Sequence, residues 1–293
     1  MNITVDGEPT PPTVTLTPEV NYNCDGTGTI TATPNIATYN YTYELDGVLN
    51  SPDPTSNVFP NVAPGTYTVR TNYTPQTTPT PSLLLREDFG NGLTIQNPNT
   101  TGYFYEEQTT ATNPNIRPGD TDTFINDYEY AVTSSIVNPF GAWINPSDHT
   151  SNGSVADGRY LVINIGAPAP GQIIYQKAVN DIIPNQPLEV SLWLVNLIRS
   201  TSSLVEPDLT IELRDTGSGA VVATANTGAV PNNEIWNQYV LTLNPGANTS
   251  LDLVITTNES EISGNDVAID DISVFQIPEV CPLFVELPVI VEA

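Results

Sequence analysis

Positive charge is scarce in this sequence, which has seven Lys and Arg against 33 Asp and Glu and a formal net charge of −26. Nucleic-acid binding needs basic side chains that neutralise phosphates, so this composition excludes a nucleic-acid partner. Attraction to an anionic membrane surface is disfavoured for the same reason. The sequence also lacks any apolar run long enough to span a bilayer, so we expect no membrane insertion.

Cysteine and histidine are almost absent. The chain has two cysteines, Cys24 and Cys281, and one histidine, His149. Residues so few and so far apart do not provide the common ligand sets of a zinc site. A disulfide between the cysteines would require the last segment to return to the first domain, and the sequence leaves this open. Otherwise each cysteine is a small buried apolar residue or pairs outside this chain.

Catalytic patterns are lacking around His149. No nucleophile-elbow motif accompanies it, and we expect Asp148 or Thr150 to cap a turn while His149 packs on Trp143. A glycosidase pair of carboxylates stays open, because carboxylates are too numerous here for their presence to be informative. The sequence therefore predicts that the protein is not an enzyme.

Short runs of alternating apolar and polar residues fill the sequence, broken by Pro, Gly and Asn, and no stretch has apolar residues at helical spacing. This pattern is typical of strands and turns, and it predicts an all-β protein. Residues 1–74 are expected to form an immunoglobulin-like sandwich. Within it, Tyr67 follows a tight Pro-Gly turn, where its hydroxyl can reach back to the backbone as in a tyrosine corner. The strands expected there are 13–17, 28–33, 39–45, 56–59 and 65–72.

The alternation of Pro and Thr at 75–82 favours an extended linker, so a domain boundary is expected there. Residues 83–278 are expected to form a jelly-roll sandwich, because about ten strands with long loops suit that fold. Those strands are 83–88, 128–136, 160–165, 172–178, 188–198, 209–214, 220–225, 235–243, 250–257 and 267–275. We expect 279–293 to begin a following element, and the apolar run at the chain end suggests a fragment of a longer secreted protein.

Several motifs resemble a known family in their order and spacing. CDGTGTI at 24–30, LDG at 45–47 and PGTYTV at 64–69 resemble the repeat of gliding-motility surface adhesins exported by type IX secretion. The larger domain resembles a module of the same proteins. Its landmarks are EDFGNG at 87–92, DHT at 148–150, DGRYL at 157–161, PNQP at 184–187, Trp193 and GNDVAIDDI at 264–272. The last motif also resembles the final strand of jelly-roll carbohydrate-binding modules and meprin-type adhesion domains.

That resemblance implies that the first and last strands of the larger domain lie together and share a structural calcium ion. Adjacent like charges in a sheet are costly unless something neutralises them, and calcium takes six to eight oxygen ligands. We expect Asp270 and Asp271 to point to opposite faces of their strand. The alternative is acidic strand ends that are hydrogen-bonded to loop backbone. The predicted calcium ligands are Glu87, Asp88, Asp266, Asp270 and Asp271.

Sugars stack on exposed aromatic faces, so the tryptophans are candidate ligand platforms, although most Trp in small sandwiches belong to the core. On 188–198, Trp193 shares a face with Glu189 and Ser191, opposite an apolar face. Further candidates, expected to be exposed in loops, lie between 97 and 126. The candidate ligand-binding residues are Trp143, Trp193, Tyr103 and Tyr105.

We therefore expect a fragment of a large extracellular, cell-surface adhesin, repeated along a filament. Its partners would be surface glycans or other extracellular polymers and neighbouring domains of the same chain. The competing hypothesis is a carbohydrate-binding module of a secreted polysaccharide-degrading enzyme. A catalytic domain elsewhere in the gene would favour this second hypothesis.

Overall fold

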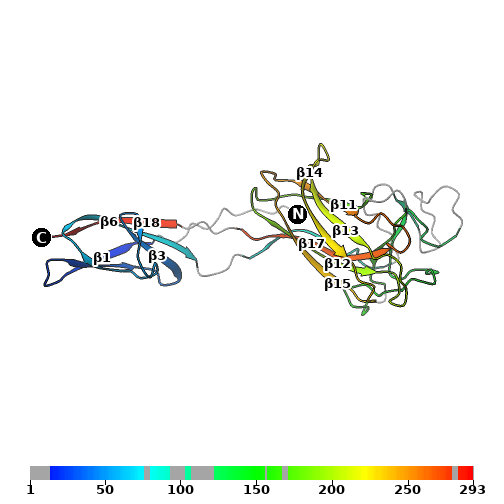
Figure 1. Ribbon diagram of the computed structural model, residues 1–293, viewed down its shortest axis with the longest axis horizontal. Helices are drawn as coiled ribbons and strands as arrows, with labels where there is room; N and C mark the ends of the chain where they lie inside the picture. The colour runs from blue at the N-terminus through cyan, green and yellow to red at the C-terminus, as the bar shows by residue number, and fades with distance from the viewer. Residues whose placement is uncertain are drawn as a thin grey trace. The chain divides into compact units, whose positions relative to one another are not determined.

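In the computed structural model, the described residues are 14–75, 80–92, 103–106, 122–155, 157–166, 171–278 and 283–292. Every helix or strand assigned among them is a β-strand, which confirms the predicted all-β class (Figure 1). The strands divide into two compact units. Unit 1 comprises Met1–Pro79 together with Glu279–Ala293, and unit 2 comprises Thr80–Pro278. No helix in the described part of the chain has the length and hydropathy needed to cross a lipid bilayer.

Unit 1 is a sandwich of two antiparallel sheets. The first has the order β1 (Leu16–Tyr22), β2 (Gly28–Pro34), β5 (Val58–Val62). The second has the order β18 (Leu283–Val291), β6 (Gly65–Pro75), β3 (Tyr39–Leu45), β4 (Val48–Leu49). Alternate residues of both sheets fill the core between them, among them Ile30, Phe59 and Val69. The Tyr67 hydroxyl donates to the carbonyl of Ala63 at 3.0 Å, as the tyrosine-corner pattern predicted.

The expectation that 279–293 begins a following element is wrong. Strand β18 pairs with β6 along its whole length, from Leu283 opposite Tyr73 to Val291 opposite Gly65 (Figure 1). Its side chains alternate between the core and solvent. Val289 is buried in the unit 1 core, and its neighbour Ile290 is exposed. The strand therefore pairs with the edge of β6 that the N-terminal segment alone would leave unpaired, and unit 2 is inserted in the chain between β6 and β18.

The expected linker at 75–82 lies partly outside the described residues. Pro75 is the last residue of β6, Ser82 is the first of β7, and 76–79 are not described. Cys24 is exposed, and Cys281 also lies outside the described residues, so the pairing of the two cysteines stays open.

Unit 2 is a larger sandwich with jelly-roll character. Its first sheet has the order β15-β12-β17-β10-β9-β8, and β7 also pairs with β17. The bounds are β15 Asn237–Leu243, β12 Leu188–Asn196, β17 Val267–Gln276, β10 Tyr160–Asn164, β9 Glu129–Thr133, β8 Phe104–Tyr105 and β7 Ser82–Glu87. The second sheet has the order β11 (Ile173–Val179), β16 (Leu251–Thr257), β13 (Asp208–Arg214), β14 (Val221–Ala229). The first and last strands, β7 and β17, are neighbours, as the resemblance implied.

The main core of unit 2 lies between its two sheets. On β12, Leu188, Val190, Leu192 and Leu194 face this core, as the alternation predicted. The opposite face of the first sheet is partly covered. There Val195, Tyr160 and Ala268 pack under a loop segment that contributes Trp143 and Ile144. This loop segment does not cover the part of the outer face over β7, β17, β12 and β15, where the site described below lies.

Candidate ligand-binding groove

A β-bulge in β17 sets the geometry of the site. Ser191 of β12 lies opposite Ser273, whereas Trp193 lies opposite Asp270, so β17 has two residues where β12 has one. Asp271 lies within the bulge with a φ of 47°, in the left-handed region that Asp tolerates better than most residues. The bulge interrupts the alternation of side chains. The expectation that Asp270 and Asp271 point to opposite faces is wrong for this reason.

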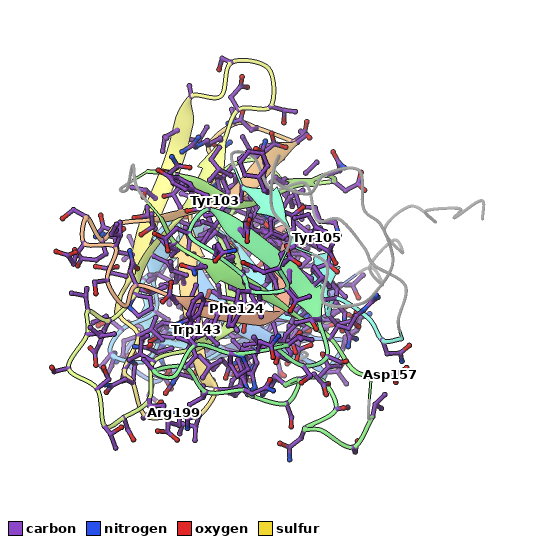
Figure 2. All side chains as sticks on the ribbon, turned by 90° about the vertical axis from the view of Figure 1, so that its right-hand side faces the viewer. Tyr103, Tyr105, Phe124, Trp143, Asp157 and Arg199 are labelled. Atoms are coloured by element: carbon purple, nitrogen blue, oxygen red, sulfur yellow. The ribbon has the colours of Figure 1, made fainter. Side chains whose placement is uncertain are left out.

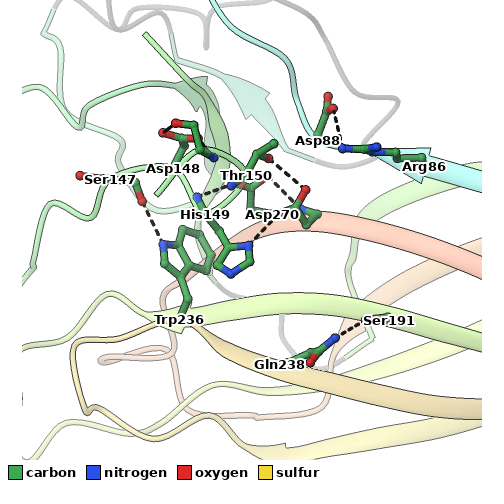
Figure 3. Close-up of polar contacts among 12 residues, drawn as sticks. Arg86, Asp88, Ser147, Asp148, His149, Thr150, Ser191, Trp236, Gln238 and Asp270 are labelled. Atoms are coloured by element: carbon green, nitrogen blue, oxygen red, sulfur yellow. Dashed lines mark hydrogen bonds and ion pairs between the residues drawn. The ribbon is translucent and has the colours of Figure 1, made fainter. Parts of the chain in front are cut away.

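Both carboxylates instead hold the same loop, and Figure 3 shows Asp270 beside His149 and Thr150 of this loop. Asp270 accepts hydrogen bonds from the backbone N–H groups of His149 at 2.8 Å and Thr150 at 3.3 Å. Asp271 lies 2.6 Å from Nδ1 of His149 and accepts a hydrogen bond from Oγ1 of Thr150 at 2.9 Å. Asp270 is fully buried, and this burial raises its pKa to about 7 although the backbone donors oppose the shift. The strand and the loop are therefore joined by a buried polar contact next to the exposed face.

Aromatic contacts also hold the loop that contains His149. His149 stacks on Trp193 with ring centroids 3.8 Å apart. It also forms a T-shaped pair with Trp236, with ring centroids 6.1 Å apart. The expectation that His149 packs on Trp143 is wrong, since its ring contacts are with Trp193 and Trp236. Trp236 donates from Nε1 to the carbonyl of Ser147 at 2.9 Å (Figure 3). The predicted turn cap is confirmed for Asp148, which accepts from the backbone N–H and the hydroxyl of Ser151.

A groove of about 300 Å³ runs over the outer face beside this loop. The described residues that line it come from four strands, which are Leu83 and Arg86 of β7, Ser191 and Trp193 of β12, Gln238 of β15, and Asp271, Ile272, Ser273 and Phe275 of β17. Gln238 donates to the Ser191 hydroxyl at 3.1 Å, and Arg86 lies 3.6 Å from Asp88. Trp193 is half-buried, with one face under His149. The groove thus combines two aromatic residues with an amide, hydroxyls and one charge of each sign.

Three of the four candidate ligand platforms are buried instead. Trp143 is 3% exposed and donates from Nε1 to Asp266 at 3.0 Å. Tyr103 and Tyr105 were expected to be exposed in loops, and that expectation is wrong, since they are 8% and 1% exposed and belong to the main core (Figure 2). Tyr105 lies in β8, a short strand beside β9. Of the four candidates, Trp193 is the residue with surface in the groove.

The five predicted calcium ligands have different partners. Glu87 contacts Lys177 at 2.5 Å, and Asp88 contacts Arg86. Asp266 accepts from Trp143 and from the backbone N–H of Ile165, and burial raises its pKa to about 7. Asp270 and Asp271 bind the 148–150 loop. Among the described residues, no three acidic, His or Cys side chains are grouped for a metal, so the structure does not assemble the five into one site, and the calcium ion stays a prediction.

The sequence identified Trp193 but missed most of its neighbours in the groove. Gln238, Arg86 and Phe275 reach the groove because β15, β17 and β7 are adjacent in the sheet. The alternation of side chains on each strand could have shown which of their residues face outward. It could not show which strands are neighbours, so the grouping came only from the topology.

No protein-family model and no curated protein matches this sequence. Solved structures match at low similarity. A cyclase from Fischerella sp. shares 13% identity over 68% of this chain and 97% of its own, with a TM-score of 0.42. The CBM22-1 xylan-binding domain of Paenibacillus barcinonensis Xyn10C shares 14% identity over 69% of this chain and 99% of its own, with a TM-score of 0.34. A CBM4 structure shares 13% identity over 41% and 72%, with a TM-score of 0.32.

At these identities and TM-scores, the matches assign neither a family nor a ligand to this chain. The chain's own strands and groove define its class. It is an all-β protein in which an immunoglobulin-like sandwich contains an inserted jelly-roll sandwich, and the jelly roll has a partly aromatic groove on one sheet.

Proposed function

We propose that unit 2 binds glycans in the groove over β7, β17, β12 and β15, as part of an extracellular adhesin. The observation that carries this proposal is the lining of the groove. Trp193 offers aromatic surface for the apolar face of a sugar ring. Around it, Gln238, Ser191 and Arg86 provide amide, hydroxyl and guanidinium groups that match sugar hydroxyls.

Contacts within the protein already orient the side chains of the groove. Trp193 is held by the His149 ring, and His149 is held in turn by Asp271. Gln238 is oriented by its hydrogen bond to Ser191. A ligand therefore does not need to order these side chains, and this reduces the entropic cost of binding.

The arrangement favours binding over catalysis. Glycosidases of the common type use two carboxylates on opposite sides of the scissile bond. Among the described lining residues of the groove, Asp271 is the one carboxylate, and it is engaged by the His149 ring. His149 also has a structural role, because it joins β17 to the loop that borders the groove. Hydrolysis of a polysaccharide that is lost in His149→Ala with the fold intact would contradict this part of the proposal.

The adhesin role is supported by the order of the strands along the chain. Because unit 2 is inserted between β6 and β18, tension applied between β1 and β18, the first and last of the described strands, acts through unit 1. The ligand-binding unit would then lie outside the segment that transmits this tension. The alternative, a binding module of a secreted polysaccharide-degrading enzyme, is supported by the groove alone. The flanking sequence distinguishes them, since tandem copies favour the adhesin and a catalytic domain favours the enzyme.

Native affinity electrophoresis of the full chain through gels that contain soluble polysaccharides tests the proposal. We expect retardation by at least one of xylan, mixed-linkage glucan, galactomannan and alginate. Arg86→Ala should reduce it, because Arg86 is exposed and lines the groove. Arg199→Ala, an exposed residue of unit 2 that does not line the groove, is the matched control for the loss of one positive charge. Equal retardation of both variants and the wild type would contradict a binding role for the groove.

A further inference from the structure

Unit 1 has an aromatic hollow of its own. It measures about 480 Å³ and lies beside the paired strands β3 and β6. Its aromatic lining consists of Tyr39, Tyr41 and Tyr43 from β3 and Tyr73 from β6. Tyr39 and Tyr73 are stacked, with centroids 5.5 Å apart and planes at 30°. The hollow therefore contains a platform in which the half-buried Tyr39 ring is backed by the buried Tyr73 ring.

Strand geometry explains why these tyrosines gather. Residues 39, 41 and 43 alternate along β3 and so share one face, and Tyr41 lies directly opposite Tyr73 in the antiparallel register. Tyr43 and Tyr73 are buried and anchor the cluster to the core, whereas Tyr39 and Tyr41 are half-buried. The Tyr41 hydroxyl donates to the carbonyl of Ile36, which fixes its ring. The platform is thus preformed.

The described lining of the hollow contains no charged side chain. Apart from the tyrosines it consists of Asn40, Thr42, Thr55, Asn72 and Thr74. In a chain with 33 acidic and seven basic residues, a charge-free surface suits a neutral ligand, because a charged ligand gains no ion pair there. Side chains alternate along β3 and β6, so Asn40, Thr42, Asn72 and Thr74 point away from the tyrosines, and Asn72 bonds Glu44 and Arg70 on that other face. The tyrosine side of the hollow therefore offers phenol rings and hydroxyls.

We infer that this hollow is a second glycan-binding site, specific for neutral sugars. Sugar hydroxyls both donate and accept hydrogen bonds, as do the Tyr hydroxyls here. Aromatic grooves also bind extended proline-rich peptides, but proline has no N–H, so such a peptide would leave acceptors of the lining without donors. The site rests on unit 1 residues alone and does not depend on the unit 2 groove. With two sites on one chain, a polysaccharide long enough to reach both would be held more tightly than by either.

The test uses the full chain in native affinity electrophoresis against neutral hydroxyethyl cellulose, arabinoxylan and galactomannan. The background variant, Arg86→Ala/Trp193→Ala, disables the unit 2 groove. We expect this background to retain binding to at least one polymer. Adding Tyr39→Ala should then weaken that binding about tenfold or more, as expected when an aromatic stacking partner is lost. Tyr39→Phe, which keeps the ring and removes the hydroxyl, should weaken it by a smaller factor and covers the case in which Tyr39→Ala lowers the unfolding midpoint.

Tyr22→Ala is the matched control, since Tyr22 is 57% exposed in unit 1 and does not line the hollow. Absence of binding in the background would overturn the second site and leave the unit 2 proposal intact. Binding that depends on Tyr39 but not on Arg86 or Trp193 would support the second site and contradict the unit 2 proposal. Tyr39-dependent binding of a synthetic peptide PQTTPTP, with no binding of the polymers, would also overturn the inference.

Discussion

The imidazole of His149 lies flat on the indole of Trp193, with centroids 3.8 Å apart and ring planes at 21°. The same imidazole contacts Asp271 through Nδ1. One side chain therefore connects the loop, the bulged strand β17 and Trp193 of the groove. The first prediction follows from this position.

His149→Ala should destabilise unit 2 by about 1–3 kcal/mol, because it removes an aromatic contact and a hydrogen bond to a carboxylate. It should also weaken glycan binding by loosening Trp193. Thermal unfolding followed by Trp fluorescence is a suitable measurement, since all three tryptophans lie in unit 2. His149→Phe, which keeps a ring on Trp193, should lose less stability. An unchanged midpoint in His149→Ala would show that the stack is incidental.

The stability of unit 2 should fall as pH rises towards 7, which is the opposite of the usual effect of carboxyl groups. Burial raises the pKa of Asp266 and of Asp270 to about 7, above the ordinary value near 4 that each has in the unfolded chain. Between these values the folded state binds more protons than the unfolded state. Stability from this source is therefore full below about pH 4 and is lost as pH rises through 7, by up to about 1.4 kcal/mol per pH unit for each carboxyl.

We expect the unfolding midpoint of unit 2 to be higher at pH 5 than at pH 8. The Asn variants keep oxygen acceptors for the Trp143 and His149 donors but do not titrate, so Asp266→Asn and Asp270→Asn should each flatten the dependence. A midpoint that rises from pH 5 to pH 8 in the wild type would contradict the raised pKa values.

If the predicted calcium ion binds, it should raise the free energy of unfolding of unit 2 by about 2.7 kcal/mol when free calcium is 100 times its dissociation constant, and the unfolding midpoint should rise with it. In the structure Glu87 contacts Lys177, so binding would require this carboxylate to change partner. Unfolding with calcium and with a chelator is the comparison, and Glu87→Gln should reduce the difference. Equal midpoints, together with no metal by elemental analysis, would rule out the ion.

Two substitutions in β18 test whether this strand contributes to the core of unit 1. Val289→Asp puts a carboxylate into the unit 1 core and should destabilise that unit by about 3 kcal/mol or more. Ile290→Asp, one residue further on the exposed face, should change stability by about 0.5 kcal/mol or less. Calorimetry resolves the units, and the unit 2 transition should stay unchanged. Equal effects of the two substitutions would contradict the pairing of β18 with β6.

The sequence predicted the strands better than their partners, and the reason is physical. Alternation along β12 correctly placed Leu192 inward and Trp193 outward, because strand periodicity is local. The pairing of β18 with β6 joins residues such as Arg70 and Glu286, 216 positions apart, and no local pattern encodes that contact. A segment with the right alternation can complete any open sheet edge, so its role was assigned wrongly.

The site was predicted in part for the same reason. Alternation placed Asp270 and Asp271 on opposite faces, but the bulge adds a residue to β17 and turns both toward one loop. Tyr103 and Tyr105 lie in a segment with little periodicity and still supply core rings, because β8 pairs beside β9. The sequence identified Trp193 because it is an aromatic residue on the otherwise polar face of a clearly alternating strand.

The central claim is that glycans bind over Trp193. Its most direct test is a two-dimensional NMR titration of the full chain with an oligosaccharide from a polymer that retards it, observing the three tryptophan indole N–H signals. Trp193 lines the groove, whereas Trp143 is buried and bonded to Asp266, so Trp143 serves as an internal control. The account predicts that the Trp193 signal shifts and saturates with ligand while the Trp143 signal stays in place. Saturable binding with a stationary Trp193 signal would contradict it.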